Sequence, residues 1–283
     1  MKRFIFIVTV ILSAVAMVSC GKDDKGNKQK QEQIVGDEDT GAYDQDMGHP
    51  GSAHTLSSSQ VQEISGTPWH IEQWFDGGSN TLTFWNNGTF KASWNRPGDY
   101  LVSVGYTYSI NNPVKHTDKK FAADYNYKKF GNGGDFSWIG AYGWTVEPLT
   151  EWFIVDDSFD TRTGMPSYAK EMGNIDLDYA TYTTYAVWKE NYPSINGNQD
   201  FLQIWCVRSS KRSKGHMSLH AHFKKFAALF HGQTEAIPVS TDYDKTVTVS
   251  FGKLFKVTLA AEAGQNAVGG IEYNHFNVTD NQQ

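Results

Sequence analysis

The stretch that decides the fold is residues 81–94, which read Thr81-Leu82-Thr83-Phe84-Trp85-Asn86-Asn87-Gly88-Thr89-Phe90-Lys91-Ala92-Ser93-Trp94. Two runs of aromatic and β-branched residues flank the step Asn86-Asn87-Gly88. Asn and Gly tolerate the positive φ angles of a tight turn, so an Asn-Gly step between such runs is a strong hairpin signal. The sequence therefore predicts an antiparallel hairpin here.

Period-two alternation continues along the chain from about Thr67, with Gly, Asn or Asp between the runs. The further strand-like runs are Tyr100–Tyr108, Phe121–Tyr127, Glu151–Val155, Tyr179–Trp188, Phe201–Val207, Thr246–Ser250 and Phe255–Ala261. A helical pattern is found at His222–Phe230, where apolar residues recur at i, i+3, i+4 and i+7. Many strands and one short helix predict an all-β domain of two packed antiparallel sheets.

Composition narrows the class of protein. The 283 residues include 17 Phe, 14 Tyr and 9 Trp, too many bulky side chains for a disordered chain. The net charge of −6 argues against a nucleic-acid partner, which would need a basic face. Aromatic sheet surfaces are common in sugar-binding proteins, but we expect most of these rings to face the core.

The N-terminus has the pattern of an export signal. Lys2 and Arg3 precede an apolar run that is too short to span a membrane. Met17-Val18-Ser19-Cys20-Gly21 resembles the lipobox of bacterial lipoproteins, and the following Gly21–Asp24 resembles a signal for export to the cell surface. We therefore expect a signal peptide at 1–19, an acylated Cys20 that anchors the chain in the outer membrane, a flexible tether over 20–65, and one domain over 66–283. Cys206 is expected to be a buried, small apolar residue.

The run Ala141–Asp156 contains Tyr142-Gly143-Trp144-Thr145 and then Pro148-Leu149-Thr150-Glu151-Trp152-Phe153. It resembles the nucleophile strand of glycoside hydrolase family 11, the endo-β-1,4-xylanases. Further stretches resemble the same family in the same order: Trp74–Gly78, Tyr192–Gly197, Phe201–Ser213 and Leu259–Gln265. The resemblance covers about 69–278 and implies a strongly curved β-jelly roll that acts on xylan without a metal or cofactor.

The resemblance implies that Glu151 is the nucleophile and Glu262 the general acid/base of a retaining glycosidase, which needs two carboxyl groups about 5–5.5 Å apart. As an alternative, Glu151 could be a solvated charge. Alternation places Glu262 on the same open face as Thr258 and Ala260. Glu272 is the other candidate for the acid.

The resemblance also places Asp99 beside the acid/base, where two carboxyl groups would share a proton and favour acid pH. An ordinary turn aspartate is an equal alternative. Trp74 would stack on a sugar ring, or else pack in the core. The remaining residues implied to bind substrate are Trp138, Tyr142, Tyr185, Lys189, Pro193, Ser194, Ile195 and Gln203, with Ser194-Ile195 at the tip of the family's thumb loop; Tyr142 could instead be structural and the tip a simple turn.

Four features depart from the family pattern. Lys189 stands where an Arg is usual, and it lacks the planar fork of Arg. Phe153 stands where a Tyr is common, and Tyr185 could provide the missing hydroxyl group. Gly264 replaces an aromatic residue, and 233–250 is longer than the family's connection.

Two other functions remain open: a non-catalytic glycan-binding lipoprotein, and a closed β-barrel carrier, which the polar, Asn- and Gly-rich strands disfavour. His220, His222 and His231 could suggest zinc, but no carboxylate or Cys set accompanies them, and histidines on a helix face are usually solvated. We expect a monomeric domain, with no metal.

Overall fold

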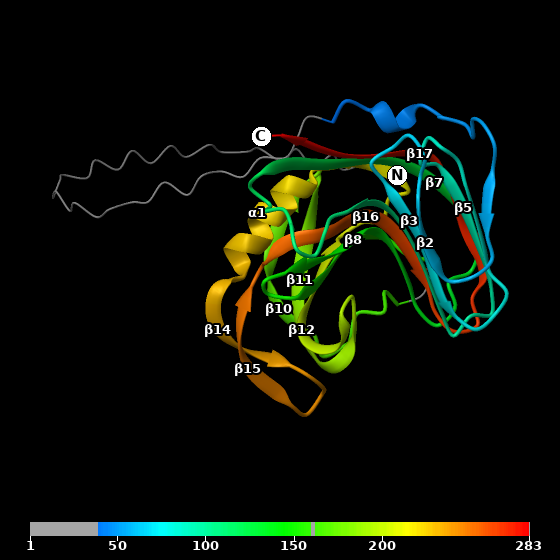
Figure 1. The fold of residues 1–283 in the computed structure, drawn as a ribbon. Helices are drawn as coiled ribbons and strands as arrows, with labels where there is room; N and C mark the ends of the chain where they lie inside the picture. The colour runs from blue at the N-terminus through cyan, green and yellow to red at the C-terminus, as the bar shows by residue number, and fades with distance from the viewer. Residues whose placement is uncertain (1–38, 160–161, 283) are drawn as a thin grey trace, which may run out of the picture. The chain divides into compact units, whose positions relative to one another are not determined.

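The computed structural model describes residues 39–159 and 162–282 (Figure 1). The signal peptide, Cys20 and most of the expected tether therefore lie outside the described residues. The elements are η1 (Ala42–Asp44), β1 (His54–Leu56), β2 (Gln60–Glu63), β3 (His70–Asp76), β4 (Thr81–Phe84), β5 (Phe90–Asn95), β6 (Asp99–Thr107), β7 (Lys119–Gly131), β8 (Ser137–Val146), β9 (Thr150–Asp157), β10 (Lys170–Leu177), β11 (Ala180–Ser194), β12 (Gly197–Arg208), β13 (Lys214–Met217), α1 (Leu219–Leu229), β14 (His231–Pro238), β15 (Asp244–Ser250), β16 (Lys253–Ala263) and β17 (Val268–Gln282).

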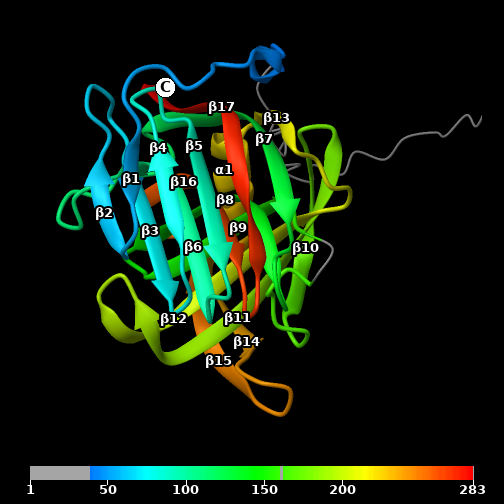
Figure 2. The same cartoon turned by 90° about the vertical axis from the view of Figure 1, so that its right-hand side faces the viewer.

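Two curved sheets pack against each other (Figure 2). One has six strands in the order β1-β4-β5-β17-β7-β13, and the other has nine in the order β10-β11-β12-β9-β8-β16-β6-β3-β2. The predicted all-β architecture with one short α-helix is confirmed. Pairing is antiparallel except between β9 and β12, which run parallel because the β10–β11 hairpin intervenes in the chain between them.

The predicted hairpin at 81–94 is present as β4 and β5. Phe84 pairs with Phe90, and the backbone N–H of Gly88 donates to the carbonyl of Trp85 at 3.0 Å. Gly88 has φ 83°, a conformation that favours glycine, and a Cβ there would lie 2.5 Å from the Phe276 ring.

Alternation along the nine-stranded sheet separates two apolar layers. In β9, Trp152 and Ile154 point into the core between the sheets, whereas Phe153 and Val155 join a second cluster on the other face. Glu151 alternates with Trp152, so it lies on the face of this second cluster. The site is thereby fixed to the face of the large sheet that points away from the core.

The helix α1 covers part of the core with Phe223 and Phe226, as predicted. In the described ranges no helix is long and apolar enough to cross a membrane. Cys206 is buried as expected, and its Sγ lies 3.9 Å from Nδ1 of His222.

The expectation that the helix histidines are solvated is wrong for two of them. His222 is fully buried with Nε2 3.3 Å from Asp178 Oδ2, and His220 is buried with Nδ1 3.3 Å from the carbonyl oxygen of Phe121. His220 packs against β7, and His222 packs against Tyr182 of β11 and Cys206 of β12. No cluster of three or more metal-ligating side chains occurs among residues 39–159 and 162–282.

The N-terminal segment 39–65 differs from the expected flexible tether. β1 pairs with β4 at the edge of the small sheet, and β2 pairs with β3 at the edge of the large one. Between its first residues and β1, His49 stacks on Trp85 at 3.9 Å and binds Glu272 at 3.1 Å. A polar segment is ordered here because the neighbouring sheet edges supply its hydrogen-bond partners.

Candidate active site

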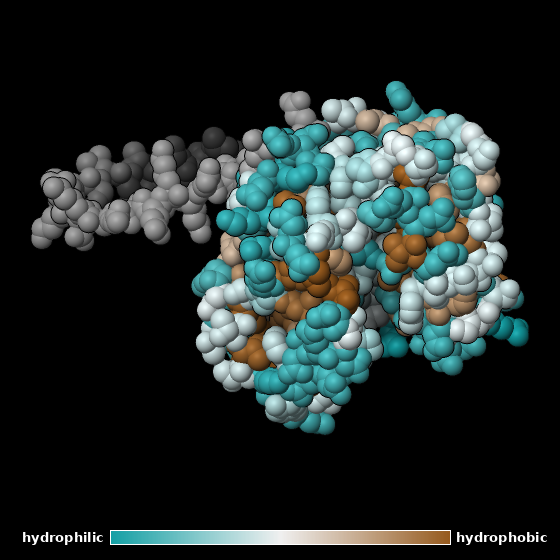
Figure 3. Space-filling model, in the orientation of Figure 1, coloured by the Kyte–Doolittle hydropathy of each residue, from teal (hydrophilic) through white to brown (hydrophobic). Residues whose placement is uncertain are grey.

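A cavity of about 590 Å³ opens on the concave face of the large sheet. Figure 3 shows the hollow in the molecular surface, with apolar side chains exposed on both sides of it. The lining residues come from β3, β6, β8, β9, β11, β12 and β16 and the neighbouring loops: Glu72, Trp74, Asp99, Leu101, Asp135, Phe136, Trp138, Tyr142, Trp144, Glu151, Phe153, Arg162, Gly164, Lys189, Tyr192, Pro193, Ser194, Ile195, Gln203, Trp205, Lys256 and Glu262. Every residue predicted for catalysis or sugar binding lines it except Tyr185.

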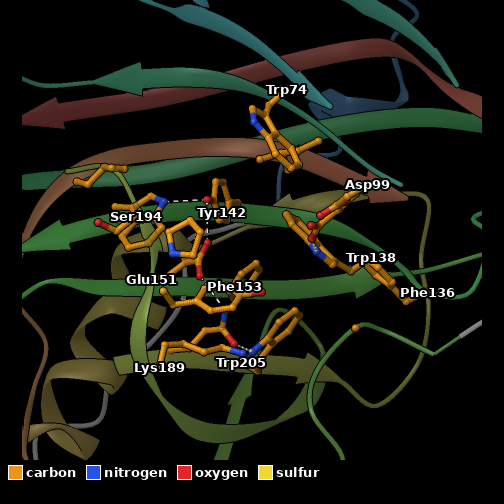
Figure 4. Close-up of a pocket in the computed structure, with 18 of the residues that line it drawn as sticks. Trp74, Asp99, Phe136, Trp138, Tyr142, Glu151, Phe153, Lys189, Ser194 and Trp205 are labelled. Atoms are coloured by element: carbon orange, nitrogen blue, oxygen red, sulfur yellow. Dashed lines mark hydrogen bonds between the residues drawn. The ribbon is translucent and has the colours of Figure 1, made fainter. Parts of the chain in front are cut away.

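Glu151 is held through both carboxylate oxygens. The hydroxyl of Tyr142 donates to Oε1 at 2.9 Å, and Nε2 of Gln203 donates to Oε2 at 2.7 Å (Figure 4). Two indoles orient these donors, because Trp144 Nε1 donates to the Tyr142 hydroxyl at 2.7 Å and Trp205 Nε1 donates to Gln203 Oε1 at 2.9 Å. The carboxylate therefore has a fixed position on rigid strands.

The charge state of Glu151 follows from two opposing effects. Burial raises its pKa to about 6, and the hydrogen bonds from Gln203 and Tyr142 and the charges of Lys189 and Lys256 oppose that rise. Glu151 is therefore largely ionised at pH 7.

Glu262 has a different environment. Burial raises its pKa well above the ordinary range, and the charges of Asp99 and Glu151 add to the rise. The indole N–H of Trp138 donates to Oε2 of Glu262. Asp99, on the adjacent strand β6, forms a side-chain hydrogen bond with Glu262, and burial raises the pKa of Asp99 to about 6. Of the two carboxyl groups in the cavity, Glu262 therefore favours its protonated form and Glu151 ionises more readily.

The thumb, defined here as residues 189–201 at the β11–β12 hairpin, supplies one wall of the cavity. Its tip contributes Pro193, Ser194 and Ile195, and Lys189 lies at its base with Nζ 4.9 Å from the centre of the Tyr192 ring.

Trp74 is 45% exposed, so its ring is available to a ligand; the core-packing alternative does not apply.

Two residues considered from the sequence lie elsewhere. Tyr185 packs against the aromatic cluster that contains Phe153 and Trp205, and it does not line the cavity. Glu272 is on β17 of the other sheet, bound to His49 and Lys91, which excludes it from this cavity.

Two departures from the family pattern have a packing explanation. Phe153 stacks on Trp205 with 3.9 Å between ring centres and meets Trp138 edge-on at 5.1 Å, so its ring serves as part of an aromatic wall. At Gly264, a Cβ would lie 2.4 Å from the ring of Phe136, which lines the cavity. Phe136 therefore occupies the space that a side chain at residue 264 would need.

One partly buried ion pair in the cavity was not predicted from the sequence. Nζ of Lys256 binds Oε2 of Glu72, to which the hydroxyl of Ser103 also donates at 3.2 Å. Lys256 also lies over the Tyr142 ring, 5.3 Å from its centre. The signal was available, because Lys256 shares the β16 face of Thr258 and Glu262, and Glu72 shares the β3 face of Trp74.

Comparison with known proteins places this arrangement in a family. Residues 67–238 match the model of glycosyl hydrolases family 11, a range that includes Glu151 and ends before Glu262. Endo-1,4-beta-xylanase C of Fibrobacter succinogenes is 35% identical over 241 residues, which cover 83% of this chain and 36% of that protein. Endo-1,4-beta-xylanase A of Bacillus pumilus is 34% identical over 200 residues, covering 71% of this chain and 81% of the relative.

The chain thus spans only about a third of the length of the Fibrobacter relative, and most of the Bacillus one. Among solved structures, the crystal structure of wild-type ENZbleach xylanase superposes with a TM-score of 0.67 at 26% identity, covering 83% of this chain and 90% of that one. The fold is accordingly the jelly roll of these enzymes. The chain belongs to glycosyl hydrolases family 11.

Proposed function

We propose that this chain is an endo-acting xylanase that hydrolyses β-1,4-xylosidic bonds with retention of configuration. The observation that carries the proposal is the contrast between two carboxyl groups in one cavity. Glu151 is bound through both oxygens by groups that favour its ionised form, and burial and the charge of Asp99 favour the protonated form of Glu262. Such a pair can supply a nucleophile and an acid at the same pH.

The reaction would proceed in two displacements. The carboxylate of Glu151 attacks the anomeric carbon, the glycosidic C–O bond breaks, and Glu262 gives its proton to the departing oxygen. A water molecule then loses a proton to Glu262 and attacks the same carbon, which releases Glu151. Configuration at that carbon is inverted twice and so is retained.

Substrate would be held by a ring face, a wall and polar groups. The exposed face of Trp74 suits stacking on a xylose ring, and the thumb tip Pro193–Ile195 would cover the chain. Lys189 would donate to a sugar hydroxyl near the cleavage point; it lacks the planar fork of an Arg, and burial lowers its pKa.

The test is hydrolysis of xylan and of cellulose by the purified full chain, with the anomeric form of the first products followed by NMR. We expect reducing ends from xylan alone, initially in the β configuration. Initial α products would exclude the role of Glu151 as a nucleophile. If neither polymer is cleaved but xylan retards the chain in an affinity gel, a non-catalytic glycan-binding role replaces the proposal.

We further propose that the chain is an outer-membrane lipoprotein exposed on the cell surface through an acylated Cys20. Support comes from Lys2, Arg3, the apolar run after them and the lipobox-like Met17–Gly21. Metabolic labelling with a palmitate analogue should mark the wild-type chain and not Cys20→Ala. Protease added to intact cells should remove the activity; labelled chain that resists the protease would place it inside the cell envelope.

A further inference from the structure

The segment that is longer than the family's usual connection forms a separate two-stranded hairpin, β14–β15, beside the thumb. Both views show it next to the strands of the β11–β12 hairpin (Figures 1 and 2). Two of its side chains are buried in the core: Val249 near its base and Ile237 near its turn. Ile237 pairs with Lys245, so the hairpin packs on the body of the domain at the same level at which Lys245 reaches the thumb.

The thumb has a structural weak point at its base. The β11–β12 ladder pairs Lys189 with Phe201 and Tyr192 with Gln199, so Glu190 and Asn191 form a bulge opposite Asp200. Asn191 has φ 46°, which is uncommon for a residue other than Gly. This bulge separates Lys189, beside the catalytic carboxylate, from the thumb tip, so its geometry sets where the tip lies.

At the bulge, side chains provide contacts in place of the regular backbone pairing between β11 and β12. The backbone N–H of Asn191 donates to Oδ1 of Asp200 at 2.9 Å. Nζ of Lys245, on β15, binds Oε1 of Glu190 at 2.6 Å and Oδ2 of Asp200 at 3.0 Å. The same ammonium lies 5.6 Å from the centre of the Trp188 ring. One lysine thus joins both strands of the thumb base to the hairpin.

We propose that Lys245 is a positioning residue for the reaction: it holds the thumb base so that Lys189 and the tip residues Pro193–Ile195 face Glu151. Isolated ion pairs on a surface contribute little, because water and salt screen them. Here one ammonium binds two carboxylates that belong to opposite strands of a bulge. A second ion pair, Lys170 Nζ to Glu235 Oε2 at 2.8 Å, joins β14 to β10.

The test compares Lys245→Met with a matched control, Lys253→Met, in the full chain. Lys253, on β16, forms a surface ion pair with Glu147 at 2.5 Å, and the two lysines have similar exposure; this pair does not involve the β11–β12 ladder. Hydrogen exchange of amides 190–200 is the first measurement. We expect Lys245→Met to exchange at least about threefold faster there, with β8 and β9 unchanged, and Lys253→Met to match the wild type.

The second measurement is xylan hydrolysis, which rests on the proposed function. We expect kcat/KM of Lys245→Met to fall roughly three- to tenfold, mainly through KM, because contacts from the tip act on bound substrate before and during reaction. Lys245→Arg should restore it, and 0.5 M NaCl should bring the wild type closer to the variant.

The outcomes separate the two proposals. Exchange and KM within twofold of the wild type in Lys245→Met, or equal losses in Lys253→Met, would overturn the role of Lys245. A wild-type chain that does not cleave xylan would overturn the proposed function, and the exchange measurement would still decide whether Lys245 braces the thumb.

Discussion

Asp99 and Glu262 share a side-chain hydrogen bond across two adjacent strands, with both carboxyl groups facing the cavity. An ionised Asp99 accepts this hydrogen bond from Glu262, so we expect Glu262 to be the weaker acid while Asp99 is charged. We expect protonation of Asp99 to release the Glu262 proton for the leaving oxygen. The relationship thus links acid strength at one carboxyl group to the charge of the other.

Asp99→Asn should therefore move the pH optimum upward. In the wild type, activity rises as Glu151 ionises with a pKa of about 6 and falls as Asp99 ionises with a pKa of about 6, so the optimum lies near pH 6. In the Asn variant, the loss of activity caused by ionisation of Asp99 disappears. Activity then falls only at the higher pH at which Glu262 itself ionises. The check is kcat/KM from pH 4 to 9; a downward shift would mean that Asp99 acts only by raising the pKa of Glu262.

Glu151→Gln should lower kcat on xylan by at least about 10³-fold, because an amide cannot form the covalent intermediate. Binding of xylan in an affinity gel should persist, since the shape of the cavity is unchanged. The control is Glu272→Gln on the other sheet, which should retain its turnover. Comparable turnover in both variants would remove Glu151 from the reaction.

Gln203→Met should move the acid limb of the pH profile upward. The Gln203 hydrogen bond favours the ionised form of Glu151, so its loss lets burial raise the pKa of Glu151 further above about 6. At pH 5 the fraction of active enzyme then falls more than at pH 7. An acid limb that stays in place while kcat drops uniformly would show that Gln203 acts on substrate instead.

Arg212→Met should lower the free energy of unfolding by about 3–5 kcal/mol, because it leaves a buried charge unpaired. Arg212 Nε donates to Asp156 Oδ2 at 2.6 Å, and the Asp156 carboxylate is fully buried with the hydroxyl of Tyr182 2.7 Å from its other oxygen. Urea denaturation provides the measurement.

The matched control is Lys214→Met, which breaks the exposed 2.6 Å pair with Asp44 and should cost less than about 1 kcal/mol. Equal losses in the two variants would contradict the importance of burial at Arg212.

Local pattern was sufficient for the strands and for the direction of many side chains. The turn chemistry of Asn87-Gly88 predicted β4 and β5, and alternation predicted that Glu262 shares a face with Thr258 and Ala260. The same rule, carried one step further, would have placed Lys256 in the cavity.

Contacts between distant segments could not be predicted in this way. Gln203 meets Glu151 because β12 runs parallel beside β9, and neither strand's own pattern specifies its neighbour. Phe136 fills the space beside Gly264, a pairing that depends on the path of two loops. The resemblance to a family, rather than alternation, supplied the functional pairing of Glu151 with Glu262.

The strand β1 lies at one edge of the six-stranded sheet, and β2 lies at one edge of the nine-stranded sheet. Each covers the open backbone groups of the strand beside it, β4 in one sheet and β3 in the other. An uncovered strand edge is a template for pairing with another molecule. A chain that begins at residue 66 would lack both strands and would expose two such edges at once. Its copies would tend to pair edge to edge and aggregate, even with every cavity residue intact.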